Sequence, residues 1–351
     1  METLDTLLAR TLADPLVHVK NADQPVGFVG LDLPLDLRLG ATRQFCHLPW
    51  DRQRKTPFAD QWLESAFPGW TRSILEDWAE GRFDLFEQVI FTRGDDACQR
   101  FYYYLCELQS RGRIGGPRPL ILDVACIPRE ISVRHNIRAL EKLLTGLGLE
   151  PDDLAAGIVR ANEYRAFYND LLSARQGRGC LYENIARSEL FCDVMPALVS
   201  AQIPVHEGSR RVLLAGSAPP DDTIHRLVEE AGWNITGEVH QRTLLRYGTP
   251  VAGGDRDPVE AVARHMNSHA SGPRTFVDRC QLLEQGIARA DADAVIIWIT
   301  GEEESLAWDV ANQKRLLETL GIPFLILTHR RWDGHDDTAG RVADFLGEIM
   351  S

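Results

Sequence analysis

Residues 293–332 constrain the fold more than any other part of the chain, because they predict a strand, a loop, a helix and a second strand in one unbroken run. The apolar, β-branched run at 295–299 is typical of a strand that is buried on both faces. Leucines and valines recur at nearly helical spacing over 305–320, and Gly321 then ends the helix before the apolar run 324–327. These residues therefore predict a βαβ unit of a parallel sheet.

A ligand site is expected where the strands of this unit end, because open parallel sheets bind ligands outside the carboxyl ends of their strands. The loop after the first strand carries three adjacent carboxylates, Glu302, Glu303 and Glu304. They could bind a metal or raise one another's pKa values, or they could only interact favourably with the dipole of the following helix. No histidine or aspartate of metal-ligand spacing accompanies them, so we predict no metal and take Glu302 as a candidate catalytic carboxylate.

The same order of elements recurs along the chain. A chain of 351 residues is too long to fold around one ordinary hydrophobic core. We predict an α/β fold with two flavodoxin-like or Rossmann-like lobes, parallel sheets and a helical bridge. The N-terminal lobe with its helical extension covers residues 1–205, and the C-terminal lobe covers residues 206–351. The strands predicted for the first lobe are residues 26–29, 85–91 and 120–125.

Composition limits the class of protein. The chain has 51 acidic side chains against 38 Lys and Arg, and the formal net charge of −13 argues against nucleic acid as the main partner. The N-terminus has no basic start followed by a long apolar run, so we predict neither a signal peptide nor a membrane span, and a cytoplasmic location. The seven cysteines are scattered without CxxC spacing, which favours reduced thiols.

The loop at residues 92–100 is a candidate active-site corner, because two adjacent carboxylates follow a predicted strand there. One hypothesis makes Asp95 a catalytic acid or base while Asp96 caps the helix that begins near Ala97. The alternative is that both carboxylates only cap this helix, as Asp often does for structural reasons alone. Arg100 is the predicted ligand-binding cation of the same loop.

The loop at residues 216–222 offers backbone N–H groups beside a helix start, an arrangement that binds phosphate or carboxylate. Ser217 is therefore a predicted ligand-binding residue, and the alternative is a purely structural turn. The loop is not a Walker loop, and no complete GxGxxG follows a predicted strand. Arg129, after the third predicted strand, could supply a positive contact to a phosphorylated cofactor such as coenzyme A.

The order of several short segments resembles the 2-hydroxyacyl-CoA dehydratase and benzoyl-CoA reductase family, and in particular the D-component of 2-hydroxyglutaryl-CoA dehydratase. The opening segment VGFVGLDLPLDLRLGA has Asp36 where the family often has Glu. The later segments that carry the resemblance are VLLAGSAPPDDTIHRLVEEAGWNI, DPVEAVARHM, DADAVIIWI and LLETLGIPFLIL. The resemblance covers most of the chain and rests on the order and spacing of these segments.

The resemblance implies an acyl-CoA substrate, a partner subunit of similar fold, and a [4Fe-4S] cluster held by three cysteines at strand ends. An ATP-driven activator would then inject the electron that makes a ketyl radical. The three ligands would fall around Phe67 and Pro68, around Gly94 and near Gly301, and none of these residues is cysteine. The family's radical chemistry is therefore not carried over to these residues, and a classical cluster is disfavoured.

A cluster rebuilt from displaced cysteines is an alternative, because Cys46, Cys98 and Cys126 fall in or near first-lobe loops. Two functions therefore remain open. One is a subunit of an acyl-CoA dehydratase, which is a lyase, or of a reductase, which binds a coenzyme A thioester and pairs with itself or a homologous subunit. The other is a catalytically silent homologue that acts as a ligand-binding or partner subunit.

Overall fold

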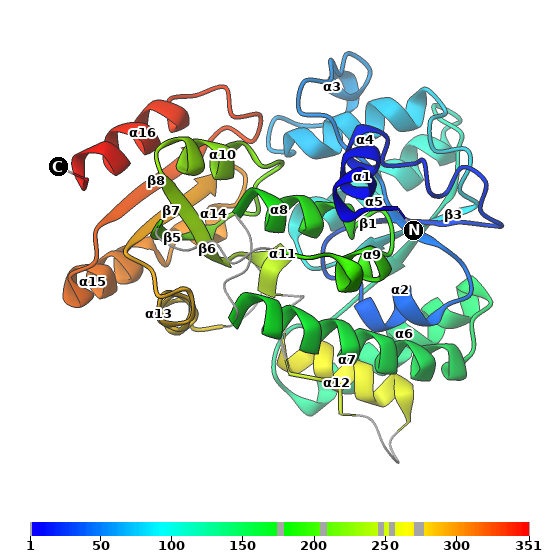
Figure 1. Ribbon diagram of the computed structural model, residues 1–351. Helices are drawn as coiled ribbons and strands as arrows, with labels where there is room; N and C mark the ends of the chain where they lie inside the picture. Colours follow the sequence, from blue (N-terminus) through cyan, green and yellow to red (C-terminus); the bar gives the residue numbers. More distant parts are fainter. Residues whose placement is uncertain are drawn as a thin grey trace.

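The described residues form two four-stranded sheets in which all neighbouring strands are parallel (Figure 1). The computed structural model describes residues 2–173, 179–203, 209–244, 249–252, 257–269 and 277–350. The first sheet has the order β2-β1-β3-β4 and the second has the order β6-β5-β7-β8. This is an α/β fold with two Rossmann-like or flavodoxin-like lobes, which confirms the predicted fold class.

The strands of the first lobe are β1 (Val26–Val29), β2 (Phe45–His47), β3 (Gln88–Thr92) and β4 (Arg118–Leu122). Those of the second lobe are β5 (Arg210–Gly216), β6 (Trp233–Val239), β7 (Ala294–Thr300) and β8 (Phe324–Arg330). The helices between α1 and α9 are α1 (Leu4–Ala13), α2 (Leu35–Gly40), α3 (Ala59–Trp62), α4 (Gly69–Ala79), α5 (Asp96–Ser110), α6 (Glu130–Leu147), α7 (Pro151–Ser173), α8 (Gly179–Ser188) and α9 (Met195–Ser200). The later helices are α10 (Thr223–Glu230), α11 (Gln241–Leu244), α12 (Pro258–Ser268), α13 (Arg279–Ala290), α14 (Glu304–Ala307), α15 (Val310–Leu320) and α16 (Thr338–Glu348).

Continuous apolar runs form the central strands of both sheets. Every residue of β1, β3 and β7 is buried, as expected for parallel strands that helices cover on both faces. The strand predicted at 26–29 is confirmed, and the strand predicted at 295–299 is one residue longer at each end. The helix predicted over 305–320 is interrupted between α14 and α15, and Gly321 ends it in the left-handed conformation at φ 66°.

The bridge between the lobes is helical. Helix α8 packs against α1 of the first lobe and against α10 and β6 of the second, and it lies between the two sheets in Figure 1. Helix α12 follows β6 in the chain but packs on α6 and α7 of the first lobe. The predicted boundary between residues 205 and 206 lies outside the described residues and stays a prediction.

Helices α2 and α7 of the first lobe cross at close distance. Asp36 on α2 and Arg165 on α7 are buried and form a two-pronged ion pair, with Nη1–Oδ1 at 3.0 Å and Nη2–Oδ2 at 2.8 Å. Backbones meet at the same place: a Cβ atom added to Gly157 would lie 1.8 Å from the carbonyl oxygen of Asp36. The crossing therefore requires glycine at position 157.

No helix in the described ranges is both long and apolar enough to cross a membrane.

Replacement of Gly157 by alanine tests this crossing. We expect Gly157→Ala to lower the free energy of unfolding by about 3 kcal/mol or more, because the new methyl group meets backbone that cannot rotate away. Gly146→Ala in α6 is the matched control, since its Cβ would meet only Leu120 at 4.0 Å. A helical Gly→Ala change without a clash changes stability by at most about 1 kcal/mol, in the stabilising direction. Urea unfolding of both variants measures the difference, and equal midpoints would contradict the assigned crossing.

Candidate functional site

A cavity of about 730 Å³ opens between the two lobes, where loops from the carboxyl ends of both sheets meet. Its walls come from the carboxyl ends of strands in both sheets and the segments that follow them, from the region between α3 and α4, and from the starts of α5 and α11. The polar residues that line it are His47, Ser65, Asp95, Asp96, Arg100, Ser217, Gln241, Arg242, Thr300, Glu302, Glu303, Glu304 and Ser305. The expectation that the loop after β7 borders a cavity at strand ends agrees with this arrangement.

Four of the five predicted site residues line this one cavity: Asp95, Arg100, Ser217 and Glu302. They come from three segments, one after β3 in the first sheet and two after β5 and β7 in the second sheet. Arg129 lies elsewhere, as an exposed residue at the N-cap position of α6, and it is not among the residues that line the cavity.

Asp95 both caps a helix and lies at the cavity wall. Its Oδ1 accepts a hydrogen bond of 2.6 Å from the backbone N–H of Cys98, so Asp95 is the helix cap, whereas Asp96, the cap expected in the catalytic hypothesis, is the first residue of α5. Burial raises the pKa of Asp95 to about 7, and the nearby carboxylates of Asp32 and Glu303 add to the rise. A carboxyl group with this pKa exchanges its proton near neutral pH, which is what general acid–base work requires.

Asp32 is a second carboxylate of this corner that the sequence analysis did not identify. It follows β1 and accepts a hydrogen bond from the Thr92 hydroxyl at the end of β3. Burial raises its pKa as well. A Cβ atom added to Gly94 would lie 2.4–2.5 Å from the carboxylate atoms of Asp32, so the Asp32 side chain fills the space beside Gly94. Two strands that are adjacent in the sheet place these groups together, and no local pattern reveals this.

Ser217 connects the loops after β5 and β7. Its hydroxyl oxygen accepts a 3.0 Å hydrogen bond from the N–H of Thr300, while its own N–H donates to the carbonyl of Trp298 at 2.8 Å. The hydroxyl donates to the carboxylate of Glu303. Ser217 is only 2% exposed, so it holds the acidic loop in place from the buried side of that loop.

Within the acidic loop, Glu303 is more buried than the predicted Glu302. Glu302 lines the cavity with an exposed side chain. Burial raises the pKa of Glu303, against the opposing effects of the Ser217 hydrogen bond and of Arg279. Its Oε2 has no hydrogen-bond partner within the described part of the chain. The acidic loop borders the cavity, as the sequence predicted. The order of the three glutamates in the sequence did not show that Glu303 is the more buried carboxylate.

Aromatic rings and one cation complete the wall. Trp50, Trp70, Trp308 and Trp332 line the cavity, and Trp308 is 84% exposed. The guanidinium of Arg100 lies over the ring of Phe67, 4.5 Å from its centroid, and pairs with Glu64 at 2.7 Å. The cavity thus combines apolar surface with carboxylates and a partly exposed arginine, as small-molecule sites commonly do.

The cavity does not fit an iron–sulfur cluster. Two of the places where the family resemblance implies thiolate ligands, Pro68 and Gly301, line the cavity, and Gly94 faces Asp32. No cysteine is among the described residues that line it. Cys46 and Cys98 are completely buried away from its wall, and burial raises the pKa of both thiols well above the ordinary value. Iron–sulfur clusters are held by thiolates, whereas the side chains gathered here are carboxylates.

Comparison with known proteins identifies a family. The family model described as 2-hydroxyglutaryl-CoA dehydratase, D-component, matches residues 51–349, which include all of the second lobe's strands and most of the cavity wall. No curated protein matches the chain.

The raised pKa of Asp95 predicts a pH-dependent stability difference between the wild type and Asp95→Asn. The folded state keeps the Asp95 proton up to about pH 7, whereas the unfolded chain loses it near its ordinary value, so wild-type stability falls as pH rises from 4 to 7. Asn keeps the cap and cannot ionise. We therefore expect Asp95→Asn to gain in melting temperature relative to the wild type across this range.

Asp95→Ala is the control for capping, because it removes both the cap and the ionisable group. It should melt lower than Asp95→Asn at every pH, by the loss of about 1 kcal/mol of capping. A difference between the wild type and Asp95→Asn that does not change between pH 4 and 8 would contradict the raised pKa.

Proposed function

Because the chain belongs to the 2-hydroxyglutaryl-CoA dehydratase D-component family, we propose that it is a dehydratase-like subunit that binds an acyl-CoA thioester in the cavity between its lobes. The match over residues 51–349 is the observation that carries this proposal, since it covers β3 and β4 of the first lobe, the strands of the second lobe and most of the cavity wall. A volume of about 730 Å³ is in the range of small-molecule sites, which supports binding of the acyl end of such a ligand.

The polar side chains of the cavity suit a thioester in different ways. Arg100 offers a positive charge to an anionic group, and Ser217 stands beside the backbone N–H groups of its loop. Asp95, with its pKa of about 7, is the proposed proton donor or acceptor, and Glu302 is the second proposed catalytic carboxylate. The tryptophans supply apolar surface for the acyl group.

We propose that this subunit carries no classical [4Fe-4S] cluster of its own. The three places implied for thiolates hold Pro68, Gly94 and Gly301, and the carboxylate of Asp32 fills the space beside Gly94. Electron transfer, where the reaction needs it, would then rest on a homologous partner subunit. Pairing with a second copy of this chain is the other arrangement to be tested.

The same substitutions favour a second function, that of a catalytically silent homologue. Such a subunit would keep the fold and the cavity but use them to bind a ligand or a partner. The two functions differ in one measurable property: an active subunit loses turnover, when assembled with its partner, if Asp95 is replaced by Asn, whereas a silent one does not.

Binding of coenzyme A thioesters is the first test. We expect a short-chain acyl-CoA to raise the melting temperature at saturating concentration. Arg100→Ala should weaken binding about tenfold, because a charged hydrogen-bonding partner of the ligand is lost. Arg111→Ala is the matched control: it removes an exposed arginine from the far end of the same helix and should leave the affinity unchanged. Absence of any shift with acyl-CoA would overturn the ligand proposal.

The iron content is the second test. After anaerobic purification we expect no stoichiometric iron, no acid-labile sulfide and no broad visible absorbance, because the cavity offers carboxylates in place of thiolates. About four iron atoms per chain, as one [4Fe-4S] cluster requires, would show that displaced cysteines rebuild a cluster.

A further inference from the structure

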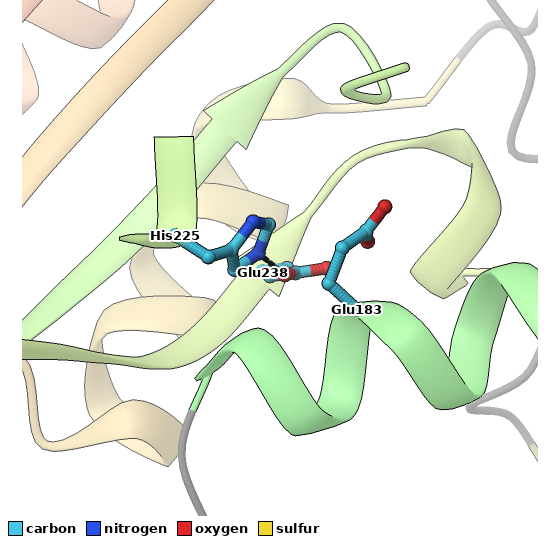
Figure 2. Close-up of side chains that lie close together, drawn as sticks. All are labelled: Glu183, His225 and Glu238. Atoms are coloured by element: carbon cyan, nitrogen blue, oxygen red, sulfur yellow. Dashed lines mark hydrogen bonds and ion pairs between the residues drawn. The ribbon is translucent and has the colours of Figure 1, made fainter. Parts of the chain in front are cut away.

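Three ionisable side chains from separate elements meet inside the second lobe. Glu183 comes from the bridging helix α8, His225 from α10 and Glu238 from β6 (Figure 2). Their ligand atoms all lie within 4.8 Å of one another, and His225 Nε2 is hydrogen-bonded to Glu238 Oε1. The cluster is separate from the cavity wall, because none of the three residues lines the cavity.

The hydrogen-bonding capacity of this cluster is not filled by the protein. Glu183 and His225 are 0% exposed. Among the described residues, neither Glu183 Oε2 nor His225 Nδ1 has a hydrogen-bond partner. An unpartnered carboxylate oxygen in the protein interior carries a desolvation cost that a cation would relieve. Two carboxylates and one imidazole whose ligand atoms lie within 4.8 Å of one another, with one buried carboxylate oxygen unpartnered among the described residues, therefore indicate a place for a positive charge.

We propose that Glu183, His225 and Glu238 form a binding site for a single first-row divalent cation such as Zn²⁺. One imidazole nitrogen and two carboxylate oxygens are a donor set that Zn²⁺ accepts. In a tetrahedral site with bonds of about 2.1 Å, ligand atoms lie about 3.4 Å apart. The hydrogen-bonded pair of His225 and Glu238 would therefore open by about an ångström, and Glu183 would move closer by about 1–1.5 Å.

Neighbouring groups would serve as outer-shell partners. Arg242 Nη2 donates to Glu183 Oε1 at 2.5 Å, and His240 Nε2 lies 2.8 Å from Glu238 Oε2. Such outer-shell contacts orient the ligands of metal sites in proteins. Glu238 also lines a second cavity, of about 70 Å³, which offers room for a water molecule as a further ligand.

The charges that face the cluster leave room for a divalent ion. Arg242 forms an ion pair with Glu183, and Arg187 is a second positive charge near it. Among the described residues, Glu238 faces the imidazoles of His225 and His240. Binding of a cation replaces the proton shared between His225 and Glu238, so affinity should rise with pH.

Titration with Co²⁺ and Zn²⁺ alone tests the proposal on the full chain after treatment with a chelator. We expect one equivalent of Co²⁺ to give visible d–d absorbance without the near-ultraviolet charge-transfer band of a cobalt–thiolate bond, and Zn²⁺ to displace it. Absence of thiolate absorbance matters because the chain has seven free cysteines. Zn²⁺ should also raise the melting temperature.

Two variants separate ligation from folding. Glu238→Gln leaves the pair between Glu183 and Arg242 intact, and His225→Asn removes the only nitrogen ligand. Each should weaken Co²⁺ binding by at least about tenfold. His269→Asn, at an exposed histidine on another element, is the control and should bind as the wild type does. No stoichiometric Co²⁺ in the wild type, a thiolate band, or unchanged binding in both variants would overturn the proposal.

Discussion

The buried ion pair between Glu183 and Arg242 is the contact on which the arrangement of the cavity depends. Both side chains are at most 3% exposed, so each charge is stable in the interior only because the other is there. The pair ties the bridging helix α8 to the second lobe. Arg242 also donates to the carbonyl of Pro219 at 2.9 Å, in the loop that carries Ser217. Ser217 in turn holds the N–H of Thr300 and the carboxylate of Glu303. A chain of polar contacts thus runs from the bridge between the lobes to the acidic wall of the cavity.

Much of the framework follows from local sequence, because parallel strands buried on both faces have a pattern of their own. The runs at 26–29 and 295–299 are strands, and the expected turn at Gly321 is present. The site could be placed for a topological reason: loops at the carboxyl ends of parallel strands converge. Asp95 and Ser217, which follow strands of different sheets, accordingly line one cavity. Strand β2 was missed because three residues carry too little periodicity to be recognised.

The sequence could not predict which polar side chains from different helices and strands contact one another. Asp32 is an ordinary loop aspartate by pattern, and its importance arises because β1 and β3 are adjacent, so that it meets Thr92. Glu183 and Arg242 are 59 residues apart and were not singled out by any motif. Burial of such pairs depends on tertiary packing, which single-residue patterns do not encode. The sequence could not distinguish Glu302 from Glu303 for the same reason, since the burial of Glu303 beside Ser217 and Arg279 comes from tertiary packing.

The surroundings of Gly94, one of the three positions that the family resemblance implies for thiolates, also oppose a cysteine there. At Gly94, any side chain would place its Cβ 2.4–2.5 Å from the carboxylate of Asp32, which is held by Thr92 and close to Asp95. A cysteine there would therefore have to displace Asp32 as well. Burial raises the pKa of both Asp32 and Asp95, and the charge of Asp32 raises the pKa of Asp95 further. Such an environment opposes the negative charge of thiolate ligands. In this chain the two parallel sheets bring loops to one cavity, and the donors at its corner are hard carboxylate oxygens rather than soft thiolates.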